Sequence, residues 1–157
     1  MKNLDENLIS RAKSILESNW RGSFTVPSPT LYPHQWSWDS AFIAIGYSHY
    51  ALDYAKSELD SILQGQWDNG LLPHIIFNPK AKGYFPDFKY WKTDEHSPTG
   101  TLTSGIIQPP VHAIAALKYF DHSHDKKTIQ NWFPKLKKFH QYLLENRDPE
   151  HSGFASI

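Results

Sequence analysis

The sequence contains no cysteine among its 157 residues. Disulfide bonds and thiol chemistry are therefore excluded, and cysteine usage gives no sign of an oxidising compartment. The chain also has no apolar run of 18 residues, and the segment Met1 to Glu6 does not resemble a signal peptide. We therefore expect a cytoplasmic protein that does not cross a membrane.

Net charge is also lacking, because 16 basic and 16 acidic side chains cancel. This balance argues against a surface that binds nucleic acid or anionic membranes. What the sequence has in excess is aromatic side chains, with 6 Trp, 8 Tyr and 9 Phe. A chain of this length is one domain or a piece of one.

Apolar residues recur at helical spacing in several stretches of the chain. Capping and turn residues separate these stretches, with Asp53 and Asp125 suited to cap helices and Pro109 and Pro110 suited to a first helical turn. Pro134 marks the start of a second stretch within the last helical region. The pattern predicts helices over residues 4–19, 38–50, 54–64 and 109–121, and a helical region that ends at Asn146.

Two long segments, 20–37 and 65–108, show no helical period and are rich in aromatic side chains. Within the second segment, the apolar run 71–77 favours an extended conformation. A loop as long as the second one inside a compact domain is usually functional. Residues 148–153 have the composition of a turn.

These elements form a repeat of architecture, in which a long loop leads to an apolar helix, a short turn and an amphipathic helix. Apolar helices begin near residues 38 and 109, and because they lack a polar face we expect them to lie inside. Their amphipathic partners should lie outside. Stacked helical hairpins of this kind predict an all-α fold, part of an α/α toroid.

The stretch from Tyr32 to Ser40 combines three aromatic side chains with a carboxylate, an amide and an imidazole. Ser37 and Asp39 suit a helix start, as a cap and a first-turn acid. A wide aromatic face beside a carboxylate suits a sugar ring, which has an apolar face and a rim of hydroxyl groups. The alternative is that Trp36 and Trp38 cover the core and that Asp39 only stabilises the helix start.

Asp39 lies at the start of the first apolar helix, and Gln108 lies just before the second. Both residues should therefore face the same mouth of a toroid. The amide of Gln108 offers donors and an acceptor to ligand hydroxyl groups. The alternative for this residue is a brace between loops.

Three motifs occur in order along the chain: Gln35-Trp36-Ser37-Trp38-Asp39-Ser40, Gly70-Leu71-Leu72-Pro73-His74-Ile75, and Thr103-Ser104-Gly105-Ile106-Ile107-Gln108-Pro109-Pro110-Val111-His112. Together they resemble the N-terminal part of glycoside hydrolase family 63, in its mannosylglycerate and glucosylglycerate hydrolase branch. The resemblance covers nearly all of residues 1–157 but less than half of such an enzyme. It implies a partial (α/α)6 barrel and hydrolysis of a small α-glucoside or α-mannoside with inversion.

The resemblance also implies a set of site residues. It places five side chains in the sugar pocket: Tyr32, Trp36, Trp38, Asp39 and Gln108. It places Tyr84 on a mobile loop that closes over the pocket. His34, His74 and His112 lie within or beside the motifs, and we interpret them as structural hydrogen-bonding residues behind the pocket rather than as metal ligands.

The family's general acid, an Asp, and its general base, a Glu, fall beyond Ile157 in this resemblance. We therefore expect no catalytic residue in this chain, no activity of the chain alone, and a separately encoded C-terminal part as one possible partner. Carboxylates that could act instead are Asp39, Asp68, Asp87, Asp94 and Glu95. Of these, only Asp39 is tied to an expected helix mouth.

Two alternatives remain open, a non-catalytic sugar-binding protein and a sugar epimerase on the same toroid, which would use histidines. No glycine-rich phosphate loop, nucleophile elbow or His-Glu-x-x-His motif occurs, so we expect neither a cofactor nor a metal. The expected ligand is a small sugar. Its aglycone and the oligomeric state do not follow from these residues.

Overall fold

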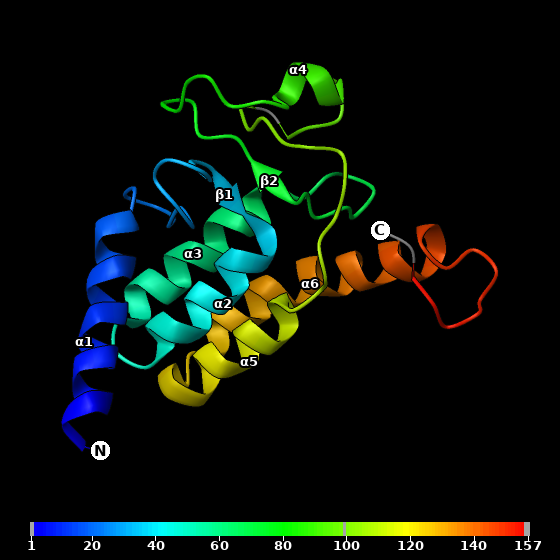
Figure 1. Cartoon of the computed structure of the whole chain (residues 1–157). Coiled ribbons are helices and arrows are strands. Elements are labelled where there is room, and N and C mark those ends of the chain that lie inside the picture. Colours follow the sequence, from blue (N-terminus) through cyan, green and yellow to red (C-terminus); the bar gives the residue numbers. More distant parts are fainter. Residues whose placement is uncertain (1, 99, 156–157) are drawn as a thin grey trace.

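The structure, a computed structural model, is mainly helical and describes residues 2–98 and 100–155, without the side chains of residues 2–4 (Figure 1). Two short strands pair antiparallel, with Gln35 opposite Ile76 and Trp36 opposite Ile75. The elements are α1 (Lys2–Asn19), β1 (Gln35–Trp36), α2 (Ser37–Ser48), α3 (Leu52–Gln64), β2 (Ile75–Ile76), α4 (Phe88–Trp91), α5 (His112–Ser123) and α6 (Lys126–Asn146).

The helices form two hairpins, α2–α3 and α5–α6, that pack side by side through α2 and α5 (Figure 1). Ala41, Ala44 and Ala115 are fully buried, and their small side chains let these helices approach closely. Tyr47 and Phe139 fill the core around them. This is the predicted partial (α/α)6 barrel, built of helical hairpins with long aromatic loops.

Helix α1 packs beside α2 at one edge of the hairpins. The hydroxyl of the buried Tyr47 donates a hydrogen bond to the carbonyl of Leu16 at 3.0 Å. The ring of Trp20, just after α1, stacks on Tyr54 of α3 with centroids 4.5 Å apart. One polar and one aromatic contact therefore fix α1 to the first hairpin.

Three predicted helix starts are wrong by a few residues. Helix α3 begins at Leu52, so Asp53 is a first-turn acid and not the cap. Ser37 is the first residue of α2 rather than its cap, because its hydroxyl hydrogen-bonds to a histidine of α5. Pro109 and Pro110 precede α5 and leave His112 to begin it.

Helix α6 continues unbroken through Pro134, where we had predicted a second stretch to begin. Its buried side chains Trp132, Leu136 and Phe139 lie on both sides of the proline and pack against the same core. Their burial outweighs the missing hydrogen bond of the proline. Asp125 caps this helix as predicted, since its Oδ1 accepts from the Thr128 N–H at 3.0 Å.

The long loops gather at one end of the hairpins, above α2 and α3 in Figure 1. We call residues 20–36 and 65–111 the loop layer. It contains both strands and the short helix α4, which the sequence did not predict and which Asp87 caps through the N–H groups of Lys89 and Tyr90. A second, small apolar cluster of Trp36, Ile75 and Phe77 holds the layer together.

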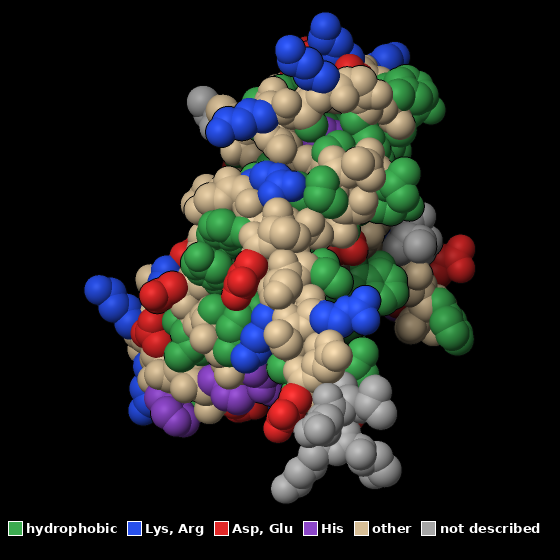
Figure 2. Space-filling model, turned by 60° about the vertical axis from the view of Figure 1, so that its left-hand side comes forward, with side chains coloured by type: hydrophobic (Ala, Val, Ile, Leu, Met, Phe, Trp, Pro, Cys, Tyr) green, Lys and Arg blue, Asp and Glu red, His purple; other side chains and the backbone are tan. Residues whose placement is uncertain are grey.

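Figure 2 shows acidic, basic and hydrophobic side chains interspersed over one face of the molecule. Within residues 2–98 and 100–155, no helix is both long and apolar enough to cross a membrane.

Candidate functional site

The first turns of α2 and α5 are joined by a buried histidine. His112, which is 1% exposed, brings its Nε2 within 2.9 Å of the Ser37 hydroxyl and 3.0 Å of the Ser37 carbonyl oxygen. Because a carbonyl oxygen only accepts, Nε2 carries the proton. Burial lowers the pKa of His112 to about 4, so its ring is neutral and serves as a fixed link between the two helix entries.

Gln108 makes a second link between the same two entries. Its Oε1 accepts a hydrogen bond from the backbone N–H of Trp38 at 2.9 Å. The carbonyl end of the Gln108 amide therefore braces the start of α2, which is the structural role that the sequence analysis left open beside ligand binding. The NH₂ end remains as the group that Gln108 can offer to a ligand.

A hollow of 420 Å³ opens between α1, the loop layer and the start of α2. We call it the Trp38 hollow. The structure brings three of the predicted site residues together here, Trp38, Asp39 and Gln108. The remaining lining residues are Ile15, Leu16, Asn19, Val26, Pro27, Phe42 and Ile43.

The Trp38 hollow is lined by two aromatic side chains, Trp38 and Phe42, and by the carboxyl group of Asp39. Trp38 is 38% exposed and lies with its ring centroid 5.9 Å from that of Phe42. Burial raises the pKa of Asp39. An exposed indole can stack on the apolar face of a ring, and the adjacent carboxylate can accept hydrogen bonds from hydroxyl groups.

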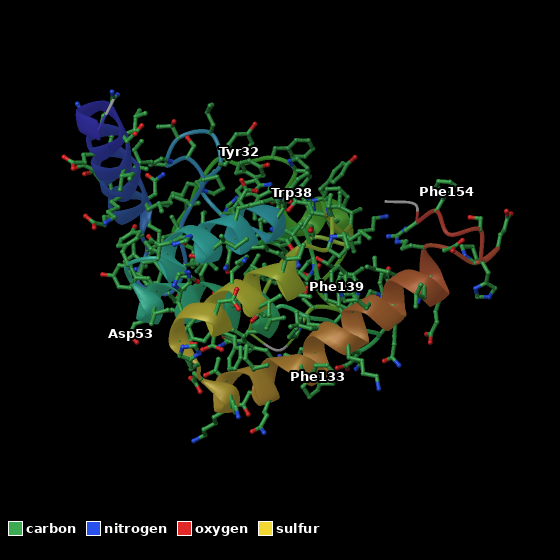
Figure 3. The ribbon with its side chains drawn as sticks, turned by 90° about the horizontal axis from the view of Figure 1, so that it is seen from below. Tyr32, Trp38, Asp53, Phe133, Phe139 and Phe154 are labelled. Carbon is green, nitrogen blue, oxygen red and sulfur yellow. The ribbon has the colours of Figure 1, made fainter. Side chains whose placement is uncertain are left out.

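The other three aromatic site residues form a cluster of their own in the loop layer. Trp36 is 7% exposed, with the rings of Tyr32 and Tyr84 edge-on at 5.3 Å and 5.6 Å. None of these three lines the Trp38 hollow. Figure 3 places Tyr32 and Trp38 on the same side of the helices, away from Phe133. A pocket role for Tyr32, Trp36 and Tyr84 stays a prediction.

His34 and His74 hold loop segments by hydrogen bonds. Nδ1 of His34 accepts from the Asn78 N–H at 3.1 Å, and Nδ1 of His74 lies 2.5 Å from the Ser104 hydroxyl. Burial lowers the pKa of each ring to about 4. Among the residues that the structure describes, no three His, Asp or Glu side chains gather to hold a metal ion.

One polar residue beneath the site was missed by the sequence analysis. Glu58 of α3 is fully buried, and burial raises its pKa to about 7. A signal for it was present, because Glu58 lies three residues after Ala55 and four before Ile62, on the apolar face of the helix. A charged residue at such a position implies a buried network.

Stacked helical hairpins, with their loops at one end and a hollow lined by Trp38 and Asp39 at the helix entries, match the architecture of six-hairpin glycosidases. The family model described as "Mannosylglycerate hydrolase MGH1-like glycoside hydrolase domain" matches residues 32–157. The chain belongs to this glycoside hydrolase family, which confirms the resemblance found in its motifs.

Individual relatives agree with this assignment. Mannosylglycerate hydrolase from Rubrobacter radiotolerans is 49% identical over 150 residues, which cover 92% of this chain and 34% of that protein. Glucosylglycerate hydrolase from Mycolicibacterium hassiacum is 39% identical over 96% of this chain and 36% of its own length. The crystal structure of the family 63 mannosylglycerate hydrolase from Thermus thermophilus with Tris superposes with a TM-score of 0.84, at 38% identity.

That structure is matched over 94% of this chain and 36% of its own. The chain thus spans about a third of the length of the relatives it matches. The comparisons favour neither the sugar-binding nor the epimerase alternative.

Proposed function

We propose that this chain supplies the sugar-binding side of an inverting glycoside hydrolase that acts on a small α-mannoside or α-glucoside, such as mannosylglycerate or glucosylglycerate. The observation that carries the proposal is the meeting of Trp38, Asp39 and Gln108 at one hollow where two helices begin. The relatives named as mannosylglycerate and glucosylglycerate hydrolases support this substrate class.

Inverting hydrolysis needs a general acid and a general base on opposite sides of the bond, about 6.5–9.5 Å apart. Asp39 is the one carboxylate among the described residues that line the Trp38 hollow. A single carboxylate cannot fill both roles. In our proposal Asp39 accepts hydrogen bonds from sugar hydroxyl groups, and the acid and base come from a part of the enzyme beyond residue 157.

The aromatic side chains take complementary roles in this proposal. Trp38 stacks on the sugar, and the NH₂ group of Gln108 donates to a hydroxyl group. Tyr32, Trp36 and Tyr84 form a further aromatic wall, of which Tyr84 closes over the bound sugar. Their mutual edge-on packing supports the placement of these rings in one wall.

The remaining part of the enzyme would cover apolar surface that is open here. Phe42, Ile114 and Leu117 of α2 and α5 are 51%, 54% and 56% exposed. Exposed apolar surface of this kind favours association. A C-terminal part, on the same chain or separately encoded, would bury it, and we expect residues 1–157 alone to self-associate and to lack glycosidase activity.

A chimera tests this proposal. Residues 1–157 replace the matching third of the Rubrobacter radiotolerans enzyme, with which they share 49% identity. We expect the chimera to hydrolyse mannosylglycerate or glucosylglycerate, and proton NMR of the fresh product to show inverted anomeric configuration. Residues 1–157 alone should show no turnover with either substrate.

The control is a chimera carrying the matching segment of the Mycolicibacterium hassiacum enzyme, which is 39% identical to this chain. An active control beside an inactive, folded chimera with residues 1–157 would point to a non-catalytic protein. Robust turnover by residues 1–157 as a monodisperse monomer would instead require a complete catalytic pair within this chain.

A further inference from the structure

The buried carboxylate of Glu58 is bound by three hydrogen-bond donors from the loop layer and α2. Its Oε2 accepts from the Thr25 N–H at 2.7 Å. Its Oε1 accepts from the Ser40 hydroxyl at 2.6 Å and from Nε2 of Gln35 at 3.2 Å. The donors come from residues 18 to 33 positions away in sequence, so one side chain of α3 joins three distant points.

Because these three groups donate, both oxygens of the Glu58 side chain must act as acceptors. A backbone N–H and an amide NH₂ can only donate, so they fit a carboxylate but not an amide in the same place. The second end of the Gln35 amide is also used, since its Oε1 accepts from the Ser61 hydroxyl at 2.8 Å. The network is therefore directional and leaves Gln35 in one orientation.

Two of these donors are sequence neighbours of residues that form two walls of the Trp38 hollow, one wall in the loop layer and one in α2. Thr25 precedes Val26 and Pro27, which line the hollow from the loop layer. Ser40 follows Asp39 and shares its helical turn with Trp38. The two oxygens of one carboxylate thus hold the two walls at a fixed separation.

We propose that Glu58 is a positioning residue for the Trp38 hollow, which sets the distance between the Val26–Pro27 wall and the Trp38–Asp39 wall by binding Thr25 and Ser40 at once. It touches no ligand itself. For the identity of the ligand this inference rests on the proposed function, but its test does not require any ligand.

Amide hydrogen exchange of residues 1–157 separates positioning from general stabilisation. It is followed at micromolar concentration by mass spectrometry with single-residue fragmentation, because dilution limits the expected self-association. The reporters of the two walls are the N–H of Val26, bonded to the Asn19 carbonyl at 3.0 Å, and the N–H of Trp38, bonded to Gln108 at 2.9 Å. The reporter of the helical core is the N–H of Tyr119 in α5. We compare Glu58→Gln with the native chain at pH 8, above the pKa of about 7 to which burial raises Glu58, so that the native side chain is a carboxylate.

The matched control is Ile62→Val, one turn further along α3 and also fully buried. It weakens the same helix without touching the hydrogen bonds of the hollow. We expect Glu58→Gln to reduce protection at Val26 and Trp38 at least tenfold more than at Tyr119. Ile62→Val should reduce protection at all three reporters by similar factors.

Equal loss at all three reporters in Glu58→Gln, or no loss at any, would overturn the proposal. If Glu58→Gln does not fold, Ser40→Ala decides, because it removes one hydroxyl and leaves the carboxylate in place. A tenfold selective loss of protection at Trp38 would support positioning, and an unchanged ratio of Trp38 to Tyr119 would contradict it. Because exchange is measured without sugar, this failure is distinct from an inactive chimera.

Discussion

The helical hairpins and the loop layer are held together in different ways. The hairpins share one large apolar core, in which α2, α3, α5 and α6 bury side chains such as Leu59 and Phe139. The loop layer adds Leu71, Leu72 and Ile107 to that core, and its own apolar cluster, around Trp36, Ile75 and Phe77, is small. It depends in addition on buried hydrogen bonds, such as those from the Thr25 N–H to Glu58 and from the Ile75 N–H to the Ser104 hydroxyl.

This difference assigns separate tasks to the two regions. Apolar packing is non-directional and supplies most of the stability. Buried hydrogen bonds are directional and costly to break, so they fix geometry more than they add net stability. The Trp38 hollow lies where the two regions meet, which lets a stable helix pair carry side chains whose orientation the loop layer sets.

The largest effect should come from the shared core. Phe139→Ala removes a ring that is 1% exposed and should lower the free energy of unfolding by about 3–5 kcal/mol. The control is Phe85→Ala in the loop layer, where the ring is 73% exposed and should cost about 0.5 kcal/mol or less. Urea denaturation measures both, and equal losses would mean that the core is not concentrated in the hairpins.

Acidification should destabilise the fold through three histidines, two in the loop layer and one at the start of α5. His34, His74 and His112 have pKa values lowered to about 4, so between pH 6.5 and 4 the unfolded chain binds protons that the folded chain does not. The free energy of unfolding should therefore fall as the pH falls through this range, by up to about 1.4 kcal/mol per pH unit for each ring.

Glu58 has the opposite effect on the free energy of unfolding, which it should raise as the pH falls. Its pKa is raised to about 7, so the folded chain retains a proton that the unfolded chain loses as the pH rises from 4.5 to 7. Glu58→Gln should therefore steepen the loss of stability on acidification, as measured by urea denaturation at several pH values. A flatter profile in this variant would contradict the assignment.

A smaller effect should arise where the loop layer touches α6. Gly70 has φ +98°, and a Cβ there would lie 2.6 Å from the backbone oxygen of Lys138. Gly83 has φ +74° with nothing within 4 Å of such a Cβ. Both alanine variants carry the strain of a positive φ, about 1 kcal/mol.

Gly70→Ala should cost about 1–3 kcal/mol more than Gly83→Ala, because it also overpacks against α6. Thermal unfolding of the two variants gives the difference. Equal melting temperatures would mean that the loop layer moves away from α6 without cost.

The sequence predicted the hairpins better than the loop layer, for a physical reason. Apolar spacing is a local signal, and it located α2, α3, α5 and α6 to within a few residues. The role of Ser37 could not be predicted from its sequence neighbours, because its hydroxyl binds His112, 75 residues away, rather than capping its own helix. The same holds for Glu58, whose partners Thr25, Gln35 and Ser40 lie 18 to 33 residues away in sequence.

The site was predicted in part. Trp38, Asp39 and Gln108 do meet, because each lies near the start of one of two adjacent helices. The burial of Trp36 between Tyr32 and Tyr84 did not follow from the pattern, since a tryptophan in a loop suits a ligand wall and a small core equally well. The motif resemblance supplied what spacing alone could not, a class of substrate.

The most direct test of the account compares two aspartates that both lie in the first turn of a helix. Asp39 and Asp53 are first-turn acids of α2 and α3, so replacing either with Asn removes a similar helix-dipole interaction, about 0.3–1 kcal/mol. Asp39 lines the Trp38 hollow and Asp53 does not. Figure 3 shows Asp53 at the opposite end of the helices from Trp38.

The measurement is kcat/KM for mannosylglycerate and glucosylglycerate in the active chimera, with melting temperatures recorded alongside. We predict that Asp39→Asn lowers kcat/KM at least a hundredfold, about 2.7 kcal/mol of transition-state binding, while Asp53→Asn retains native kinetics and both variants melt within a few degrees of each other. Native kinetics in Asp39→Asn would contradict the account and leave Asp39 with only the structural role of a first-turn acid.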